Sequence, residues 1–137
     1  MNLNDFNKII EERIEILRNT LLSKGEEYTR GDDRLHNFKT ASRVSGNIPE
    51  VVLMGFLLKH WVSVNDMIND IAHGKIPTRT LVNEKIGDVI AYMFILEALI
   101  EDTRQIAEAV CPRCKVSAEK PTEKGTIKCS NCGNERF

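Results

Sequence analysis

The four cysteines of the chain form two Cys-x-x-Cys pairs near its C-terminus, Cys111 with Cys114 and Cys129 with Cys132. Two such pairs are typical of a zinc ribbon, in which each pair forms a short turn and four thiolates hold one zinc ion in a tetrahedron. Gly133 directly after the second pair allows the backbone to turn toward the sulfur atoms. Four thiolate ligands leave no open position for a substrate, so the sequence predicts a structural Zn²⁺ ion.

Two other uses of the cysteines fit the sequence less well. Disulfides need an oxidising compartment, and the segment Met1 to Asp5 has neither the basic start nor the apolar core of a secretory signal. A thioredoxin-like motif needs one pair in a βαβ setting, whereas here two pairs flank a short predicted strand at 126–128. We therefore expect a cytoplasmic protein with reduced cysteines.

A second group of candidate residues consists of acids at helical spacing in two apolar segments. Asp66 shares a helix face with Lys59, and Glu84, Asp88 and Tyr92 share a face of the following segment. A short connection makes the two helices antiparallel neighbours, which brings Asp66 level with Glu84. Carboxylates one turn apart repel each other unless a cation neutralises them, and hard oxygen ligands suit Mg²⁺. The three acids are thus candidate catalytic residues and magnesium ligands. The alternative is a solvated face of ion pairs.

Histidine and the connection at 24–39 supply further candidates. His60 lies on an apolar stripe, where a lone histidine is more often a hydrogen-bonded packing residue than a catalyst, and it is kept as a secondary catalytic candidate. The connection is dense in hydrogen-bonding groups suited to a phosphate or a base edge. We expect Arg34 and Lys59 to contact phosphate, and Tyr28, Asn37 and Tyr92 to lie at the ligand.

These residues require helices to position them. The apolar residues Phe6, Ile10, Ile14, Leu17 and Leu21 recur at three- and four-residue steps and predict a first helix that ends near Gly25. Asp32 or Asp33 can cap a second helix that Gly46 closes.

The next two predicted helices carry most of the apolar residues. Pro49 fits the first turn of the third, which is apolar nearly all round, runs to about Ala72 and is expected to be the buried central helix. A fourth runs from Thr78 or Thr80 to Ala109. The predicted fold class is mainly α, a four-helix bundle-like domain over 1–109 with a zinc ribbon over 110–137.

Composition excludes several classes of protein. The formal net charge of −1 supplies no global basic field for non-specific nucleic-acid binding. Charged residues interrupt the apolar segments, so we expect no membrane span. Apolar positions on more than one face of the third and fourth helices predict a homo-oligomer.

The helical part resembles phage-type nucleotide-modification-associated domains, which are loosely similar to MazG-like all-α nucleoside triphosphate pyrophosphohydrolases. The residues that carry the resemblance are Lys24, Tyr28, Asp32-Asp33, Leu35, Asn37-Phe38-Lys39, Lys59-His60, Asp66, Glu84-Lys85, Asp88 and Tyr92. The resemblance implies that acids on two antiparallel helices hold Mg²⁺, and that a triphosphate is cut between its α and β phosphates. Asp66, Glu84 and Asp88 correspond to those acids, although their spacing departs from the Glu-x-x-Glu and Glu-x-x-Asp pattern.

Two functions follow as expectations. The first is a protein that binds a nucleotide and hydrolyses it with Mg²⁺, or only binds it. The second is a non-enzymatic adaptor whose ribbon binds nucleic acid or a protein through its basic side chains.

Overall fold

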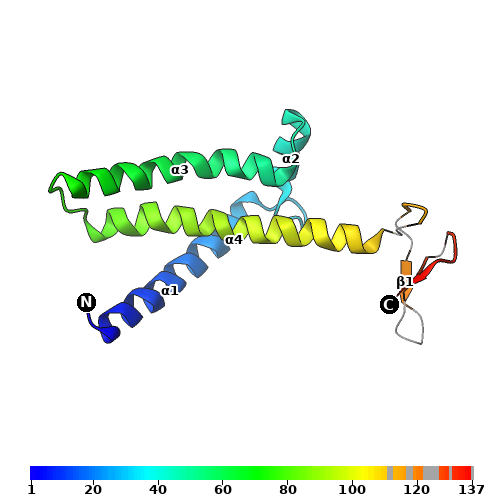
Figure 1. Ribbon diagram of the computed structural model, residues 1–137, viewed down its shortest axis with the longest axis horizontal. Coiled ribbons are helices and arrows are strands. Elements are labelled where there is room, and N and C mark those ends of the chain that lie inside the picture. The colour runs from blue at the N-terminus through cyan, green and yellow to red at the C-terminus, as the bar shows by residue number, and fades with distance from the viewer. Residues whose placement is uncertain (111–112, 117–118, 122–126, 130, 137) are drawn as a thin grey trace. The chain divides into compact units, whose positions relative to one another are not determined.

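The computed structural model describes residues 1–110, 113–116, 119–121, 127–129 and 131–136 (Figure 1). Its contacts divide the chain into two compact units, Met1–Leu99 and Ile100–Phe137. The described residues form four helices and three short strands, so the predicted mainly α fold class is confirmed. The elements are α1 (Leu3–Tyr28), α2 (His36–Ser45), α3 (Pro49–Ala72), α4 (Arg79–Ala109), β1 (Glu119–Pro121), β2 (Ile127–Cys129) and β3 (Glu135–Arg136).

Helix α1 is longer than the sequence predicted. It begins after Asn2, whose side-chain oxygen accepts a hydrogen bond from the Asp5 backbone N–H at 2.9 Å, as N-cap residues do. It then continues through Gly25 to Tyr28, so the predicted end at Gly25 is wrong. Gly25 is buried, and a Cβ atom built on it would overlap the guanidinium group of Arg34. The glycine therefore provides space for a neighbouring side chain and does not end the helix.

Helix α2 starts one turn later than an aspartate cap requires. Its N-cap is Leu35, and the Asp33 carboxylate instead accepts a hydrogen bond from the Leu35 backbone N–H at 2.9 Å and pairs with Lys39 at 3.3 Å. Desolvation raises the pKa of Asp33, but the hydrogen bonds from Leu35 and Lys39 outweigh it and leave this pKa below its usual value. Gly46 ends the helix with a φ of 72°, as predicted.

Helices α3 and α4 form an antiparallel hairpin (Figure 1). Pro49 lies in the first turn of α3, and α4 begins at Arg79, between the two predicted starts. Two contacts of one side chain join the helices. The Nδ1 atom of His60 lies 3.0 Å from the Oδ2 atom of Asp88, and its ring centroid lies 5.0 Å from that of Tyr92.

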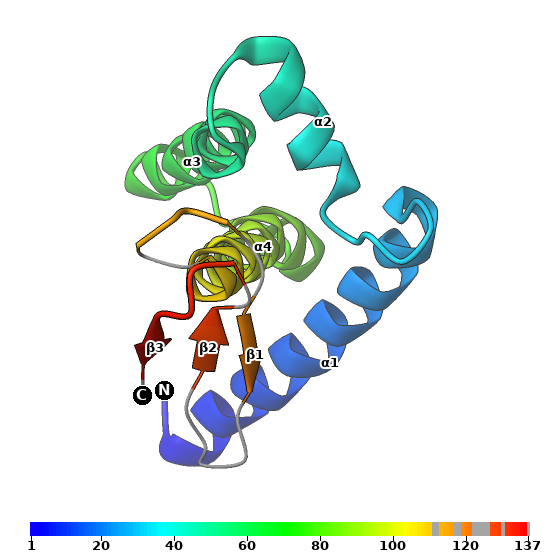
Figure 2. The same ribbon diagram turned by 90° about the vertical axis from the view of Figure 1, so that its right-hand side faces the viewer.

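The other two helices attach to this hairpin through separate contacts. Arg13 of α1 donates hydrogen bonds of 2.9 Å to the backbone oxygen and to the side-chain oxygen of Asn83 on α4. Phe38 of α2 meets Phe56 of α3 edge to face, with ring centroids 6.1 Å apart. Figure 2 looks along α3 and α4, with α2 and the C-terminal half of α1 to the right of the pair.

The hydrophobic core of the first unit is small. Its buried apolar side chains are Leu17, Leu53, Leu57, Val64, Met67 and Leu99. Three residues of the predicted apolar stripe of α1 are instead exposed, Phe6 by 52%, Ile10 by 41% and Ile14 by 56%. This part of α1 meets α4 through Arg13, not through the apolar stripe.

Helix α3 is not the buried central helix that its composition predicted. It is long and apolar enough to cross a membrane by length and composition alone, yet only 22% of its most apolar window is buried. The first unit covers one face of this helix and leaves a second apolar face exposed.

The second unit contains the three strands as one antiparallel sheet in the order β1-β2-β3. Lys120 pairs with Lys128, and Lys128 pairs in turn with Glu135. Strand β2 ends at Cys129, so the sheet positions that thiol, which is 1% exposed.

Two helical glycines provide a test of the contact between α1 and α4. A Cβ atom at Gly87 would lie 2.8 Å from Nη1 of Arg13, whereas one at Gly55 meets nothing within 4 Å. Replacing a mid-helix glycine by alanine stabilises a helix by about 0.5–1 kcal/mol. We expect Gly55→Ala to raise the free energy of unfolding by that amount. Gly87→Ala should gain less, because Nη1 of Arg13, which donates to the backbone oxygen of Asn83, must shift to make room.

Chemical denaturation followed by circular dichroism measures both changes. Equal stabilisation by the two substitutions would contradict a structural role for the Arg13 contact.

Candidate functional site

A cavity of about 640 Å³ lies within the first unit, where all four helices contribute to its wall. This volume falls in the range of small-molecule sites, roughly 300–1,000 Å³. Apolar and aromatic side chains make up most of the wall, and a few polar groups interrupt them. The lining residues are Thr20, Leu21, Lys24, Arg34, Leu35, Asn37, Phe38, Phe56, Lys59, His60, Asp88, Ala91, Tyr92, Phe94, Ile95 and Ala98.

The charged groups of this wall are mostly cationic. Lys24, Arg34 and Lys59 come from three different segments of the chain, and Asp88 is the one carboxylate among the lining residues. That carboxylate lies against His60, at 3.0 Å. Lys24 also pairs with the carboxylate of Glu27 at 3.7 Å. The wall therefore combines apolar side chains with cationic ones, a combination suited to an anion that also carries an apolar or planar part.

Arg34 owes its position to the glycine beneath it. Its guanidinium lies over Gly25 and donates a hydrogen bond to the backbone oxygen of Leu21 in α1. The missing side chain at Gly25 lets the arginine approach the helix backbone, and one of its nitrogens is held there. A guanidinium carries five N–H groups, so one bond to Leu21 still leaves donors for a ligand.

His60, Asp88 and Tyr92 form a contact group at the cavity. Asp88 and Tyr92 lie one turn apart on α4, and both face the imidazole of His60 on α3. The His60 side chain is 18% exposed and the Asp88 side chain 39% exposed. Because Nδ1 faces the carboxylate, Nε2 is the ring atom that remains for another partner.

The cavity brings together six of the residues predicted from the sequence. They are Arg34, Asn37, Lys59, His60, Asp88 and Tyr92. The side chain of Tyr28 lies outside the described part of the structure.

Asp66 and Glu84 do not line the cavity. Both are exposed, and the Glu84 carboxylate pairs with Nζ of Lys85 at 2.7 Å, a hydrogen bond that raises the pKa of the lysine. The predicted magnesium ligands Asp66, Glu84 and Asp88 do not form a cluster. Among the described residues, the one set of three or more potential ligand atoms within 4.8 Å of one another consists of cysteines. The described residues therefore give no support for a shared Mg²⁺ ion at these carboxylates, and the magnesium site stays a prediction.

Sequence patterns did not identify several lining residues as part of a site. Phe56 and Phe94 fit the description of core residues, and Lys24 and Phe38 were named only among the residues that carry the resemblance. One available signal was partial: Phe56 and Lys59 lie one turn apart on α3, on the same face as the predicted polar stripe.

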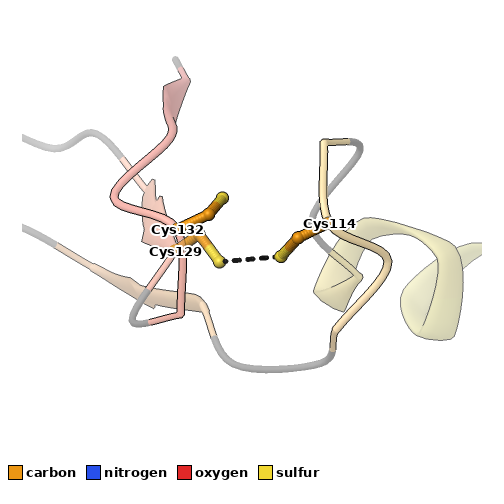
Figure 3. Close-up of side chains that lie close together, drawn as sticks. All are labelled: Cys114, Cys129 and Cys132. Atoms are coloured by element: carbon orange, nitrogen blue, oxygen red, sulfur yellow. Dashed lines mark hydrogen bonds between the residues drawn. The ribbon is translucent and has the colours of Figure 1, made fainter.

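The cysteine cluster belongs to the second unit (Figure 3). The sulfur atoms of Cys114, Cys129 and Cys132 all lie within 4.8 Å of one another, and those of Cys114 and Cys129 are 3.5 Å apart. Sulfur atoms at about 2.3 Å from a tetrahedral metal ion lie about 3.8 Å from each other. The three cysteines are in the reduced form and close enough to hold a metal ion. Cys111, the fourth predicted ligand, lies outside the described residues.

The residues that follow the two cysteine pairs share one backbone conformation. The residue after the second cysteine of each pair has a left-handed backbone, with φ of 59° at Lys115 and 70° at Gly133. The Gly133 N–H donates to the Cys129 carbonyl at 2.9 Å and closes its turn. Hydrogen bonds from the Asn131 side chain and the Val116 backbone lower the pKa of the Cys114 thiol to about 6. A lower pKa favours the thiolate, which is the form that binds metals.

Comparisons with known proteins leave the family open. No protein-family model matches the chain, and no curated protein or solved structure shows significant similarity to it. The resemblance to MazG-like enzymes therefore stays a prediction.

The thiol cluster predicts a bound metal that a single substitution removes. Cys129→Ser takes away the most buried sulfur, whereas Arg113→Ser changes an exposed residue between the first two cysteines and keeps every thiol. Elemental analysis of purified protein should find one metal ion per chain in the wild type and in Arg113→Ser, and much less in Cys129→Ser. Equal metal content in all three proteins, or none in the wild type, would contradict the site.

Proposed function

We propose that the cavity of the first unit binds a nucleotide. The observation that carries this proposal is that Lys24, Arg34 and Lys59 meet at a cavity whose wall is otherwise largely apolar and aromatic. A nucleotide joins phosphates to a planar base, and cations and aromatic rings are the side chains that recognise those two parts. The cavity volume of about 640 Å³ is adequate for a ligand of this size.

The wall suggests how such a ligand lies. Arg34 and Lys59 are positioned for the phosphates, and Arg34 is held by its bond to Leu21 before any ligand binds. The rings of Phe38 and Phe56, which already contact each other, offer an apolar surface for the base. Asn37 supplies an amide for a base edge or a sugar hydroxyl.

The proposed function of the cavity is nucleotide binding, and hydrolysis of the bound nucleotide is a further step that binding does not require. Because Asp66, Glu84 and Asp88 do not cluster, no step is derived through a protein-held Mg²⁺ ion. His60 is the cavity residue that we propose for proton transfer, with Asp88 orienting its ring. A release assay for pyrophosphate and phosphate therefore distinguishes an enzyme from a nucleotide-binding protein.

For the second unit we propose a zinc ribbon with a structural role. Zinc is the metal that two Cys-x-x-Cys turns most often hold, and Cys111 supplies the fourth thiolate in this proposal. Apparent binding energies of about 10–16 kcal/mol are enough to order a segment this small. The three strands of its sheet are only two or three residues long, which supports a stabilising role for the metal.

Substitution of a single lysine tests the cavity. Lys59→Gln removes a lining cation, whereas Lys8→Gln removes an exposed cation of α1 that does not line the cavity. Calorimetry with common ribo- and deoxyribonucleoside triphosphates should show binding to the wild type and to Lys8→Gln. Binding to Lys59→Gln should be about tenfold weaker or worse, the effect of losing about 1.4 kcal/mol or more. Equal affinity of Lys59→Gln and Lys8→Gln would refute this site.

A second variant tests the site of Arg34 without changing the arginine itself. In Gly25→Ala, the new methyl group would occupy the space of the guanidinium, so Arg34 must move away from Leu21. We expect weaker nucleotide binding with the helical content unchanged, as measured by calorimetry and circular dichroism. Gly55→Ala is the control, because a Cβ atom there meets nothing. Unchanged affinity in Gly25→Ala would exclude Arg34 as a phosphate contact.

A further inference from the structure

Helix α3 carries two apolar stripes, and the first unit covers only one of them. The inner stripe faces α4 and follows alternating steps of four and three residues: Leu53, Leu57, His60, Val64, Met67 and Ile71. The outer stripe follows the same steps one residue later: Met54, Leu58, Trp61, Asn65, Ile68 and Ala72. Four of its apolar members are exposed by 49 to 62%, namely Met54, Leu58, Trp61 and Ile68. Alternating steps of four and three are the pattern of a helix that packs along a neighbouring helix.

Helix α4 repeats this arrangement. Its inner residues Asp88 and Tyr92 face α3, and the positions one residue later form a second stripe. That outer stripe consists of Val82, Ile86, Val89, Met93 and Leu96, of which Met93 is 49% exposed. Neither outer stripe contains a charged side chain.

The two outer stripes lie on the same side of the hairpin. One residue corresponds to a rotation of about 100° around a helix, and the helices run in opposite directions. A one-residue step therefore turns both stripes toward the same side. Positions one residue before the inner stripes turn to the opposite side, where Phe56, Lys59 and Ala91 line the cavity. Figure 2 shows α2 and the C-terminal half of α1 on that cavity side of the hairpin.

The exposed area is more than a chain of this size needs to leave uncovered. The chain exposes 10052 Å². Two separate globular proteins with the sizes of the two units would together expose about 8,600 Å², and the surplus of about 1,500 Å² exceeds the roughly 800 Å² that each partner buries in a standard interface. The outer stripes span about 27 Å along α3 and about 20 Å across two helices, which is adequate for such an interface.

The chemistry of this face favours protein over lipid. Helix α3 carries Lys59 and Asp66 in its middle turns, and a charge near the centre of a membrane helix costs about 2.5–3.5 kcal/mol. Asn65 lies in the middle of the outer stripe. A single asparagine in an apolar stripe is a known means of fixing the register of paired helices. Because both outer stripes come from one hairpin, a second copy offers a partner face of the same length and the same uncharged character.

We propose that the outer face of the α3–α4 hairpin packs against the same face of a second copy of this chain, around a two-fold axis. The two hairpins form a four-helix core that covers Met54, Leu58, Trp61 and Ile68. The cavities point away from this core, so the test of dimerisation is independent of the test of nucleotide binding.

The only tryptophan of the chain, Trp61, lies at the centre of this face and reports on it directly. Sedimentation velocity of the full chain at tens of micromolar should give twice the 15.6 kDa mass of one chain. On dilution, dissociation should shift the tryptophan emission to longer wavelength as the side chain enters water.

Substitutions on opposite sides of the unit complete the test. Leu58→Glu places a charge in the proposed interface and should weaken dimerisation by about 100-fold or more. Val44→Glu introduces the same charge on α2, at a residue that is 85% exposed, and should leave the dimer intact. Circular dichroism checks that both variants stay helical. If Leu58→Glu fails to fold, the dilution series of the wild type decides alone.

Three results would overturn the proposal. One is a wild-type monomer at tens of micromolar, and another is a folded Leu58→Glu variant that associates as tightly as Val44→Glu. The third is a monomer whose Trp61 emission shifts to shorter wavelength only when vesicles of phosphatidylcholine and phosphatidylglycerol are added, which would assign this face to a lipid surface.

Discussion

The contact of His60 with Asp88 and Tyr92 is the interaction on which the first unit depends. It joins α3 to α4 at 3.0 Å and thereby fixes which residues of the two helices lie level with each other. Once that register is set, residues one position earlier on each helix face the cavity, and residues one position later face the uncovered side. The candidate ligand site and the proposed dimer face are thus two consequences of a single helix pairing.

Two glycines determine how closely α1 and its arginine contacts approach the neighbouring backbone. Gly87 of α4 lies under the guanidinium of Arg13, and Gly25 of α1 lies under that of Arg34. In both places an arginine occupies the volume of an absent side chain and bonds to backbone oxygen, at Asn83 and at Leu21. The Arg13 contact holds α1 on α4, and the Arg34 contact holds a cation at the cavity. Helix packing and the charge of the site thus both depend on an arginine that lies over a glycine.

The two units have different sources of stability. The helical unit buries few side chains completely, and its stability in isolation is limited by that small core. The C-terminal unit has three short strands and a cluster of thiols that could hold a metal ion, and binding of such an ion would stabilise this unit. In the two proposals, a partner chain would bury more apolar surface of the first unit, and a metal ion would cross-link the strands and turns of the second.

The sequence by itself determined the elements. Apolar periodicity, Pro49 and Gly46 predicted α2, α3 and α4 closely, and the cysteine spacing predicted the thiol cluster, because these signals act over a few residues. Tertiary structure alone decided which faces meet. Periodicity placed Asp66, Glu84 and Asp88 on helix faces but could not say whether their carboxylates meet, and among the described residues the close group of potential metal ligands consists of cysteines. It likewise predicted α3 as the buried central helix, because periodicity cannot count the neighbours of a helix, and the described helices cover only part of α3.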